Sequence, residues 1–268
     1  MKYFYVITIL ALFSCKDSGN QTEVEELSEG IVYEEYSGVA PTTPEETEFY
    51  KPVPPVVKTY EKNIAPSDAI VLFNNNSLNE WISVKNPDSP ADWIINADSS
   101  FTVKNKAGDI QTKKEFGNIQ LHLEWKSPAE IQGENQSRAN SGVFLQGRYE
   151  IQILDNNDND TYVNGQVGSI YKQHIPLVKA SVPSGEWNTY DIIYNAPEFD
   201  KRGNKIKSAT ITLLHNGVLV QNHQEIKGTT EYIGWPKNEA HGKAPIILQD
   251  HGDNSRVSFR NIWVRELK

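Results

Sequence analysis

The sequence predicts an all-β protein in which two antiparallel sheets pack face to face. Short runs rich in β-branched and aromatic residues recur along residues 66–268, and turn-forming residues separate them. Within several runs apolar and polar residues alternate, as expected for strands with one buried face. No long stretch repeats its apolar residues at the helical period. A sheet with one apolar face must cover that face, and a second sheet is the simplest cover.

The strand signals follow one another along the chain. They are AIVLF (69–73), SFTVKN (100–105), DIQTKK (109–114), NIQLHLEWK (118–126), NSGVFLQGRYEIQILD (140–155), TYDIIYN (189–195), ATITLLHNGVLVQN (209–222), APIILQDHG (244–252) and VSFRNIWVREL (257–267). Residues 118–126 alternate most cleanly. His122, Glu124 and Lys126 should share one face, and apolar residues should occupy the other.

Two local hairpins are predicted. The segments 100–105 and 109–114 should pair with each other around Ala107 and Gly108. Asn216 and Gly217 lie between two β-branched runs and predict a type I′ turn, in which both central residues take positive φ.

The first residues have the features of a targeting segment. Lys2 is a short basic region, and Tyr3–Phe13 form an apolar stretch too short to span a bilayer. Ser14 before Cys15, the one cysteine of the chain, resembles a bacterial lipobox, which implies cleavage before Cys15 and its acylation. The expected location is the outer membrane, facing the periplasm or the cell surface. The alternative is a plain signal peptide with an incidental cysteine.

Four regions follow from composition. Residues 1–14 are the signal peptide, and the polar, acidic residues 15–42 are a flexible tether. Residues 43–65 are rich in proline, can begin with one helical turn at Pro44, and either dock on the domain or act as a spacer. Residues 66–268 form one β-sandwich domain.

The charge argues against two kinds of partner. The formal net charge is −9, and removal of residues 1–14 takes away one lysine and no acid, which leaves −10. An acidic protein is not attracted to nucleic acid or to an anionic bilayer surface.

Residues 140–155 raise the main functional question. They predict a strand, a short turn and a second strand, on which Glu150 and Gln152 face away from Ile151 and Ile153. These polar groups either hold a ligand or form the solvent side of a half-buried sheet. Two other strands carry similar polar faces, and a curved sheet would collect all three in one groove. The polar pairs are Glu124 with Lys126, Glu150 with Gln152, and Gln249 with His251.

Several blocks together resemble a known family. LFNNNSLNEW, LHLEWKSP, NSGVFLQGRYEIQILD, GSIYK, GEWNTYDI, LLHNGVLVQN, ILQDHG and FRNIWVREL occur in the order seen in the 3-keto-disaccharide hydrolase domain family. The resemblance covers residues 66–268 and implies a concanavalin A-like, lectin/glucanase jelly roll. It also implies activity on 3-keto-glycosides, with a divalent metal (Mn or Ca) in several members, and an upstream sugar oxidoreductase that makes the substrate.

The same stretch resembles the catalytic strand of laminarinase-type glucanases. Their E-x-D-x-x-E spacing corresponds here to Glu150, Gln152 and Asp155. Gln152 cannot titrate, and an odd offset of five strand residues puts Glu150 and Asp155 on opposite faces, ~16 Å apart. Retaining hydrolysis needs two carboxyl groups about 5 to 5.5 Å apart. Direct glucanase chemistry is therefore an alternative and not the first prediction.

A 3-keto sugar changes the chemical requirements. The ketone acidifies the hydrogen on C2, and loss of that proton lets the glycosidic oxygen on C1 leave by β-elimination. Glu150 and His251 are the predicted catalytic residues, and a divalent metal would be held by Glu150, His251 and Asp155.

The remaining candidates bind substrate. They are Gln152, Gln249, Glu124, Lys126, Tyr171 and Arg260. Glu124 and Lys126 either pair across the groove or form an exposed ion pair of little energetic value. Trp187 and Trp235 either stack on a sugar or fill the core. The alternative function is a carbohydrate-binding lipoprotein without turnover.

Overall fold

The structure is a computed structural model that describes residues 40–59, 64–74 and 76–268. Cys15 and the signal and tether segments up to residue 39 lie outside the described residues, so the predictions about them are not tested here. The chain divides into two units, Met1–Pro54 and Pro55–Lys268. Within the described residues, no helix combines the length and the apolar character needed to cross a membrane.

The described part of the first unit contains one short 3-10 helix, η1 (Pro44–Thr47). Pro44 occupies its first turn, where the missing backbone N–H of proline costs no hydrogen bond. The sequence predicted one helical turn at this place.

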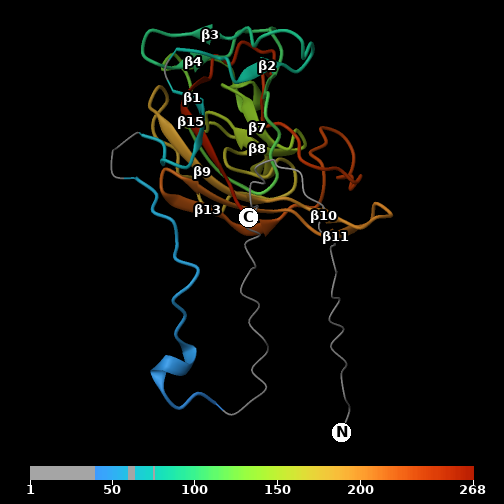
Figure 1. The fold of residues 1–268 in the computed structure, drawn as a ribbon. Helices are drawn as coiled ribbons and strands as arrows, with labels where there is room; N and C mark the ends of the chain where they lie inside the picture. The colour runs from blue at the N-terminus through green and yellow to red at the C-terminus, as the bar shows by residue number, and fades with distance from the viewer. Residues whose placement is uncertain (1–39, 60–63, 75) are drawn as a thin grey trace, which may run out of the picture. The chain divides into compact units, whose positions relative to one another are not determined.

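The second unit is a jelly-roll β-sandwich of two antiparallel sheets, as the sequence predicted (Figure 1). The larger sheet has eight strands in the order β13-β12-β9-β6-β15-β4-β3, with β1 paired to β15. Its strands are β1 (Ile70–Phe73), β3 (Ile94–Ile95), β4 (Phe101–Thr102), β6 (Ile119–Lys126), β9 (Asn188–Asn195), β12 (Thr210–His215), β13 (Val218–Glu225) and β15 (Ser258–Glu266).

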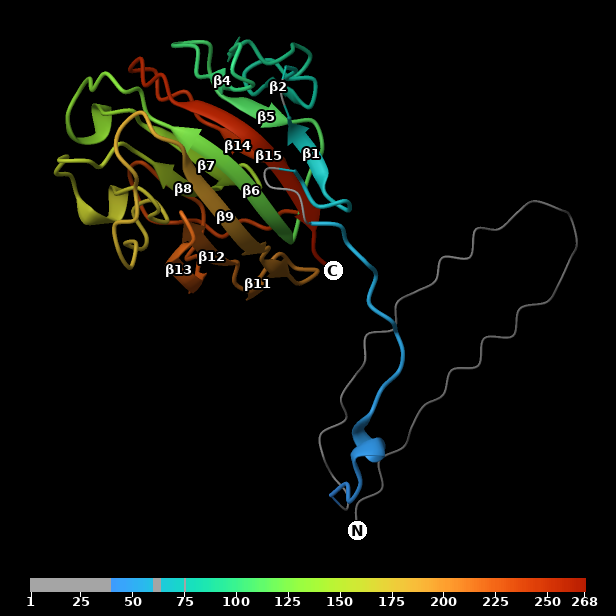
Figure 2. The ribbon, with the colours of Figure 1, turned by 90° about the vertical axis from the view of Figure 1, so that its left-hand side faces the viewer.

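The smaller sheet has five strands in the order β2-β5-β14-β7-β8. They are β2 (Trp81–Ser83), β5 (Ile110–Thr112), β7 (Ser141–Leu145), β8 (Tyr149–Ile153) and β14 (Ile247–Leu248). Figure 2 shows β7 and β8 running alongside β6 and β9 of the other layer. A separate ribbon pairs β10 (Glu198–Phe199) with β11 (Lys205–Lys207), and the short helices η2 (Asn135–Ser137) and η3 (Val163–Gly165) lie in loops.

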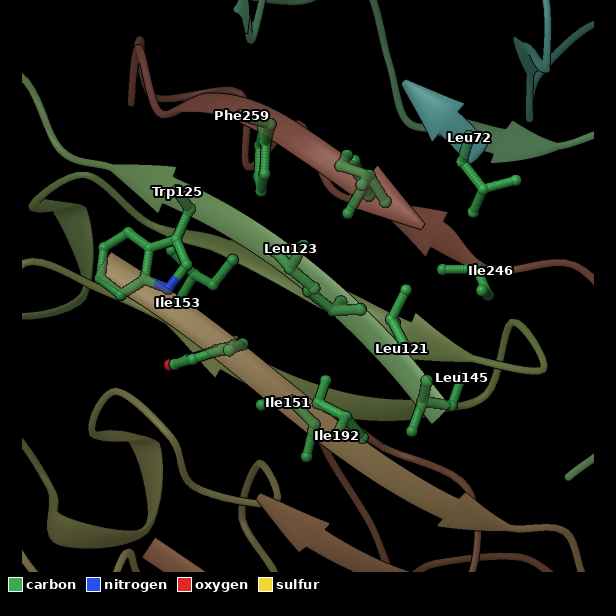
Figure 3. Close-up of a cluster of buried hydrophobic side chains, with 14 of the residues drawn as sticks. Leu72, Leu121, Leu123, Trp125, Leu145, Ile151, Ile153, Ile192, Ile246 and Phe259 are labelled. Carbon is green, nitrogen blue, oxygen red and sulfur yellow. The ribbon is translucent and has the colours of Figure 1, made fainter. Parts of the chain in front are cut away.

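The apolar core fills the space between the sheets. Figure 3 shows side chains of β6 and β9 pointing toward those of β7 and β8. Leu121, Ile151 and Ile192 are completely buried there. Alternation along each strand therefore sends one set of residues inward and the other to an outer face of the sandwich.

The hairpin predicted at Asn216 and Gly217 is confirmed. β12 and β13 pair with each other, and Asn216 and Gly217 form the turn that connects them, with φ angles of 52° and 77°. Positive φ at both positions matches the right-handed twist of the flanking strands.

The hairpin predicted around Gly108 is wrong. β4 pairs with β3 and β15 in the larger sheet, whereas β5 pairs with β2 and β14 in the smaller one. The chain crosses between the layers at this point. This crossing lets Phe101 and Ile110, which are 0% and 1% exposed, enter the core from opposite sides. Burial of both side chains thus outweighs the local turn signal.

Candidate active site

A groove of about 710 Å³ lies over the outer face of the smaller sheet. Its floor carries Phe144 of β7 with Glu150 and Gln152 of β8, and Phe144 is the cross-strand neighbour of Glu150. Ile151 and Ile153 point from the same strand into the core. The walls come from loops and contain Gln136, Ser137, Asn140, Tyr162, Tyr171, Lys172, Thr230, Tyr232, Gln249 and His251.

Glu150 lies at the floor of this groove and is only 4% exposed. In the described part of the chain, no group donates a hydrogen bond to its carboxyl. Burial, with a smaller contribution from the charge of Asp109, raises the pKa of Glu150 to about 8. The interpretation of this strand face as a solvent-exposed surface is therefore wrong.

Gly142 makes room for the Glu150 side chain. It lies on the neighbouring strand β7, opposite Gln152. A Cβ atom at this position would come within 2.6 Å of Glu150 Oε1 and 3.0 Å of its Cγ. The glycine is therefore needed to let the carboxyl lie flat against the floor of the groove.

Gln152 is oriented by two neighbours. Its Nε2 donates to Gln136 Oε1 at 3.1 Å and to Asn140 Oδ1 at 3.2 Å. This arrangement leaves the Oε1 of Gln152 buried without a partner among the described residues, and the Oε1 of Gln249 is in the same state. Both amide oxygens can accept hydrogen bonds from a ligand that carries hydroxyl groups.

Two tyrosines form the side of the groove. The hydroxyls of Tyr162 and Tyr171 share a hydrogen bond of 2.6 Å. Burial raises the pKa of both phenols, and the nearby charge of Glu150 raises them further. Both groups are thus held in the neutral form, which can donate a proton or a hydrogen bond.

Lys172 lines the groove next to Tyr171. Its Nζ donates to the backbone oxygen of Tyr232 at 2.5 Å and lies 4.4 Å from the centre of the Tyr232 ring. It also lies 5.5 Å and 5.8 Å from the rings of Tyr171 and Tyr162. The backbone of Lys172 has a φ of 58°, a left-handed conformation that is uncommon outside glycine and is found at functional sites.

His251 lines the groove from the loop that follows β14. Its Nδ1 pairs with Asp253 Oδ2 at 2.8 Å, and its side chain is 36% exposed. The carboxylate fixes the orientation of the ring and leaves Nε2 available to a ligand.

The predicted metal-ligand set is not assembled. Asp155 accepts hydrogen bonds from Ser184 at 2.6 Å and from Asn157 at 3.1 Å, and it lines a separate cavity with Arg138. Among the residues that the structure describes, no three His, Cys, Asp or Glu side chains gather in a way that could hold a metal ion. Glu150 and His251 share the groove without Asp155, which lies beyond the end of β8 and is held by Ser184 and Asn157.

Glu124, Lys126 and Arg260 do not line the groove. They lie on β6 and β15, on the outer face of the larger sheet, so the expectation that one groove collects all three polar strand faces is wrong. Glu124 accepts a hydrogen bond from Arg260 at 2.6 Å and does not pair with Lys126. Lys126 and Arg260 both lie over the ring of Trp187, at 4.5 Å and 4.1 Å.

Burial opposes ionisation of Glu124. The imidazole of His122, 4.0 Å from the carboxyl, and hydrogen bonds from Asn261 and Arg260 outweigh that effect and lower the pKa of Glu124 to about 2. The cluster is thus a satisfied network of charged groups on the sheet that faces away from the groove.

Sequence reasoning missed most of the groove wall. Tyr162, Lys172, Thr230 and Tyr232 lie in loops, which have no periodic pattern to place them. The block GSIYK, which is part of the family resemblance, contains both Tyr171 and Lys172, but only Tyr171 was predicted as a site residue.

A buried carboxyl among amide and phenol groups, in a groove on a jelly roll, is the arrangement of a ligand-binding or active site. Residues 68–265 match the 3-keto-alpha-glucoside-1,2-lyase-like domain, and the chain belongs to this family. The family was expected from the sequence, and the match confirms it. The protein is thus a glycosyl hydrolase-like, carbohydrate-active domain.

Solved structures agree with this assignment. A candidate glycosyl hydrolase from Parabacteroides distasonis is 56% identical, with a TM-score of 0.81, over 86% of this chain and 99% of that one. Two further candidate glycosyl hydrolases from the same bacterium are 20% and 24% identical, with TM-scores of 0.56 and 0.51. The match to the first covers 75% of this chain and 94% of that chain, and the match to the second covers 74% of this chain and 99% of that chain. At these sequence identities, the two structures support the fold alone. No curated protein matches the chain significantly.

Proposed function

We propose that this protein cleaves the glycosidic bond of 3-keto-glycosides by β-elimination, with Glu150 as the base. The observation that carries the proposal is the buried Glu150 carboxyl, which receives no hydrogen bond from any residue that the structure describes and has a pKa raised to about 8. A carboxylate with a raised pKa is a stronger base than an ordinary glutamate, and about one molecule in ten is ionised at pH 7.

The reaction balances without a covalent intermediate. Glu150 removes the C2 hydrogen as a proton, and the electron pair of that bond passes into the enolate of the C3 ketone. The enolate then collapses to form the C1–C2 double bond, and the bond between C1 and the glycosidic oxygen breaks. The leaving oxygen takes a proton. If water adds to the enone, its hydroxyl goes to C1 and its hydrogen to C2, and the sum is hydrolysis.

Other groove residues stabilise the charge that moves in this reaction. Tyr162 and Tyr171 supply neutral O–H groups next to Glu150, and oxygens that gain negative charge can accept from them. His251 at the edge of the groove is placed to give a proton to the leaving oxygen. The free amide oxygens of Gln152 and Gln249 accept hydrogen bonds from sugar hydroxyls.

Direct hydrolysis of the glucanase type fits the groove less well. Glu150 is the one carboxylate among the described residues that line the groove. A retaining or inverting mechanism needs a second carboxyl group on the opposite side of the bond. The other predicted member of the pair, Asp155, is engaged by Ser184 and Asn157.

The test is release of the leaving group from a 3-keto-glucoside and from its unoxidised parent, each with and without EDTA. The proposal predicts turnover of the keto sugar alone. Turnover of the parent would instead support direct hydrolysis, and turnover of neither by folded protein would leave a sugar-binding protein. Loss of turnover in EDTA, restored by Mn²⁺ or Ca²⁺, would add the divalent cation that the resemblance implies.

We also propose that the mature chain is anchored to the outer membrane by acyl groups on Cys15, with an upstream oxidoreductase supplying the keto sugar. The support is the apolar segment and the residues before Cys15. The full-length protein should partition into a detergent phase when made in a lipoprotein-processing bacterium, and Cys15→Ala should abolish this partition.

A further inference from the structure

We infer that a second cavity beside the groove binds the leaving-group sugar of a 3-keto-disaccharide, with Trp235 as its stacking platform. This cavity has a volume of about 410 Å³. It shares Tyr162, Tyr171 and Lys172 with the groove that contains Glu150. A ligand can therefore extend from one compartment to the other past these three side chains.

The loop that forms the outer wall of this cavity exposes large apolar side chains. Trp235 is 89% exposed, and its neighbours Ile233 and Tyr232 are 83% and 74% exposed. Trp235 lines the second cavity, Tyr232 lines the groove, and Ile233 lines neither. An exposed cluster of this kind next to a polar groove marks a binding surface, and the flat face of an indole suits the C–H face of a sugar ring.

The base of this loop is fixed. The backbone N–H of Thr229 donates to the oxygen of Lys237 at 2.9 Å, and Thr230 Oγ1 accepts from the backbone N–H of Glu150 at 3.0 Å. Lys172 holds the oxygen of Tyr232 from the other side. The aromatic tip is thus tied to the strand that carries Glu150, which reduces the entropic cost of using it as a platform.

The polar lining also suits a sugar ring. The side chains of Asn164 and Lys227 offer hydrogen-bond donors and an acceptor beside the apolar wall. Those of Gln173 and Glu231 also line the cavity and already pair with Gly228, Lys227 and Thr229. A monosaccharide presents one apolar face and a rim of hydroxyl groups, so this mixture is complementary to it.

The other cavity that adjoins the groove is a poorer place for a second sugar. This cavity, of about 170 Å³, adjoins the groove through Ser137 and contains Arg138, Asp155, Asp253 and Arg256. It is less than half the volume of the cavity at Trp235, and no aromatic side chain lines it.

This inference rests on the proposed function, and its test separates the two. The full protein is assayed with a 3-keto-disaccharide and with methyl 3-keto-glucoside, which has no second ring. Wild-type turnover of the methyl glycoside establishes the proposed function by itself. For Trp235→Ala, the ratio of kcat/KM for the disaccharide to that for the methyl glycoside should fall about tenfold, which corresponds to about 1.4 kcal/mol.

Two further variants complete the test. Trp235→Phe keeps an aromatic face and should restore most of the ratio. Ile233→Ala removes an equally exposed neighbour that lines neither cavity and should leave the ratio at the wild-type value. A ratio unchanged in Trp235→Ala would overturn the inference while leaving the proposed function intact. If the wild type turns over neither sugar, calorimetric binding of the disaccharide decides: equal affinity of wild type and Trp235→Ala refutes the platform, and weaker affinity of the variant supports it.

Discussion

At the scale of single residues, the proposed chemistry rests on the environment of Glu150. The residue occupies a buried strand position that an apolar side chain would fill more cheaply. Its folded-state pKa of about 8 exceeds the ordinary value of 4.5. Between pH 4.5 and about pH 8, Glu150 keeps its proton in the folded protein and has lost it in the unfolded chain. The free energy of unfolding should therefore fall as the pH rises through this window.

The corresponding prediction concerns Glu150→Gln. This variant removes the titration and should be more stable than the wild type at pH 9 by on the order of 3–5 kcal/mol, with a much smaller difference at pH 5. Urea denaturation at the two pH values measures this. An equal difference in unfolding free energy between variant and wild type at pH 5 and pH 9 would show that the Glu150 carboxyl is not desolvated.

Gly142 leads to a second prediction at this scale. In Gly142→Ala the new Cβ would meet the Glu150 carboxyl at 2.6 Å, so that side chain must move off the floor. We expect kcat for the keto sugar to fall by roughly 100-fold, the cost of misplacing a catalytic group by about 1 Å. An unchanged sheet content, measured by far-UV circular dichroism, would show that the loss of activity comes from a local change. Full activity in this variant would contradict the assigned position of the carboxyl.

At the scale of elements, the strands could be predicted and the loops could not. Alternation predicted the faces of β6 and β8, because a strand offers two sides and the core takes the apolar one. The hairpin at Gly108 was predicted wrongly, because a turn signal does not reveal that the chain changes sheets there. Lys172 and Tyr232 reach the groove from distant loops through tertiary contacts, which no local pattern encodes.

The β12–β13 turn gives a prediction at this scale. Gly217 has a φ of 77°, and a Cβ atom there would meet nothing within 4 Å. Gly217→Ala should therefore cost only the backbone strain of a left-handed alanine, about 1 kcal/mol. The melting temperature should fall by a few degrees, with kcat/KM unchanged because the turn lines neither the groove nor the cavity at Trp235. A much larger loss would mean that the turn contributes contacts beyond its own geometry.

At the scale of the whole molecule, the two outer faces of the sandwich have different roles. On the smaller sheet, no described residue donates a hydrogen bond to the Glu150 carboxyl, whereas the larger sheet surrounds Glu124 with Arg260, Asn261 and His122. Burial alone would lower the pKa of His122, but its contacts with Asp191 and Glu124 raise that pKa to about 9. The sequence shows similar polar alternation on both sheets. Only the arrangement of the sheets separates Glu150, the proposed base, from the structural carboxylate of Glu124.

Glu124→Gln tests this division. The folded-state pKa of Glu124 is about 2, so its ionised form contributes stability above pH 4.5, and that stability is lost as the pH falls toward 2. The variant should lose about 2 kcal/mol of unfolding free energy at pH 7, the size of a buried hydrogen bond to a charged group. Turnover per folded molecule should stay at the wild-type level. A selective loss of kcat would instead bring this face into the reaction.

The central claim is that Glu150 removes the C2 proton, and cleavage of a 3-keto-glucoside in D₂O tests it most directly. The product is analysed by NMR at short times against a sample without enzyme. Elimination predicts either an enone that has lost the C2 hydrogen or a hydrated sugar with deuterium at C2, and Glu150→Gln should produce neither. A cleaved sugar that retains its original C2 hydrogen would contradict the account, because direct displacement at C1 leaves that bond intact.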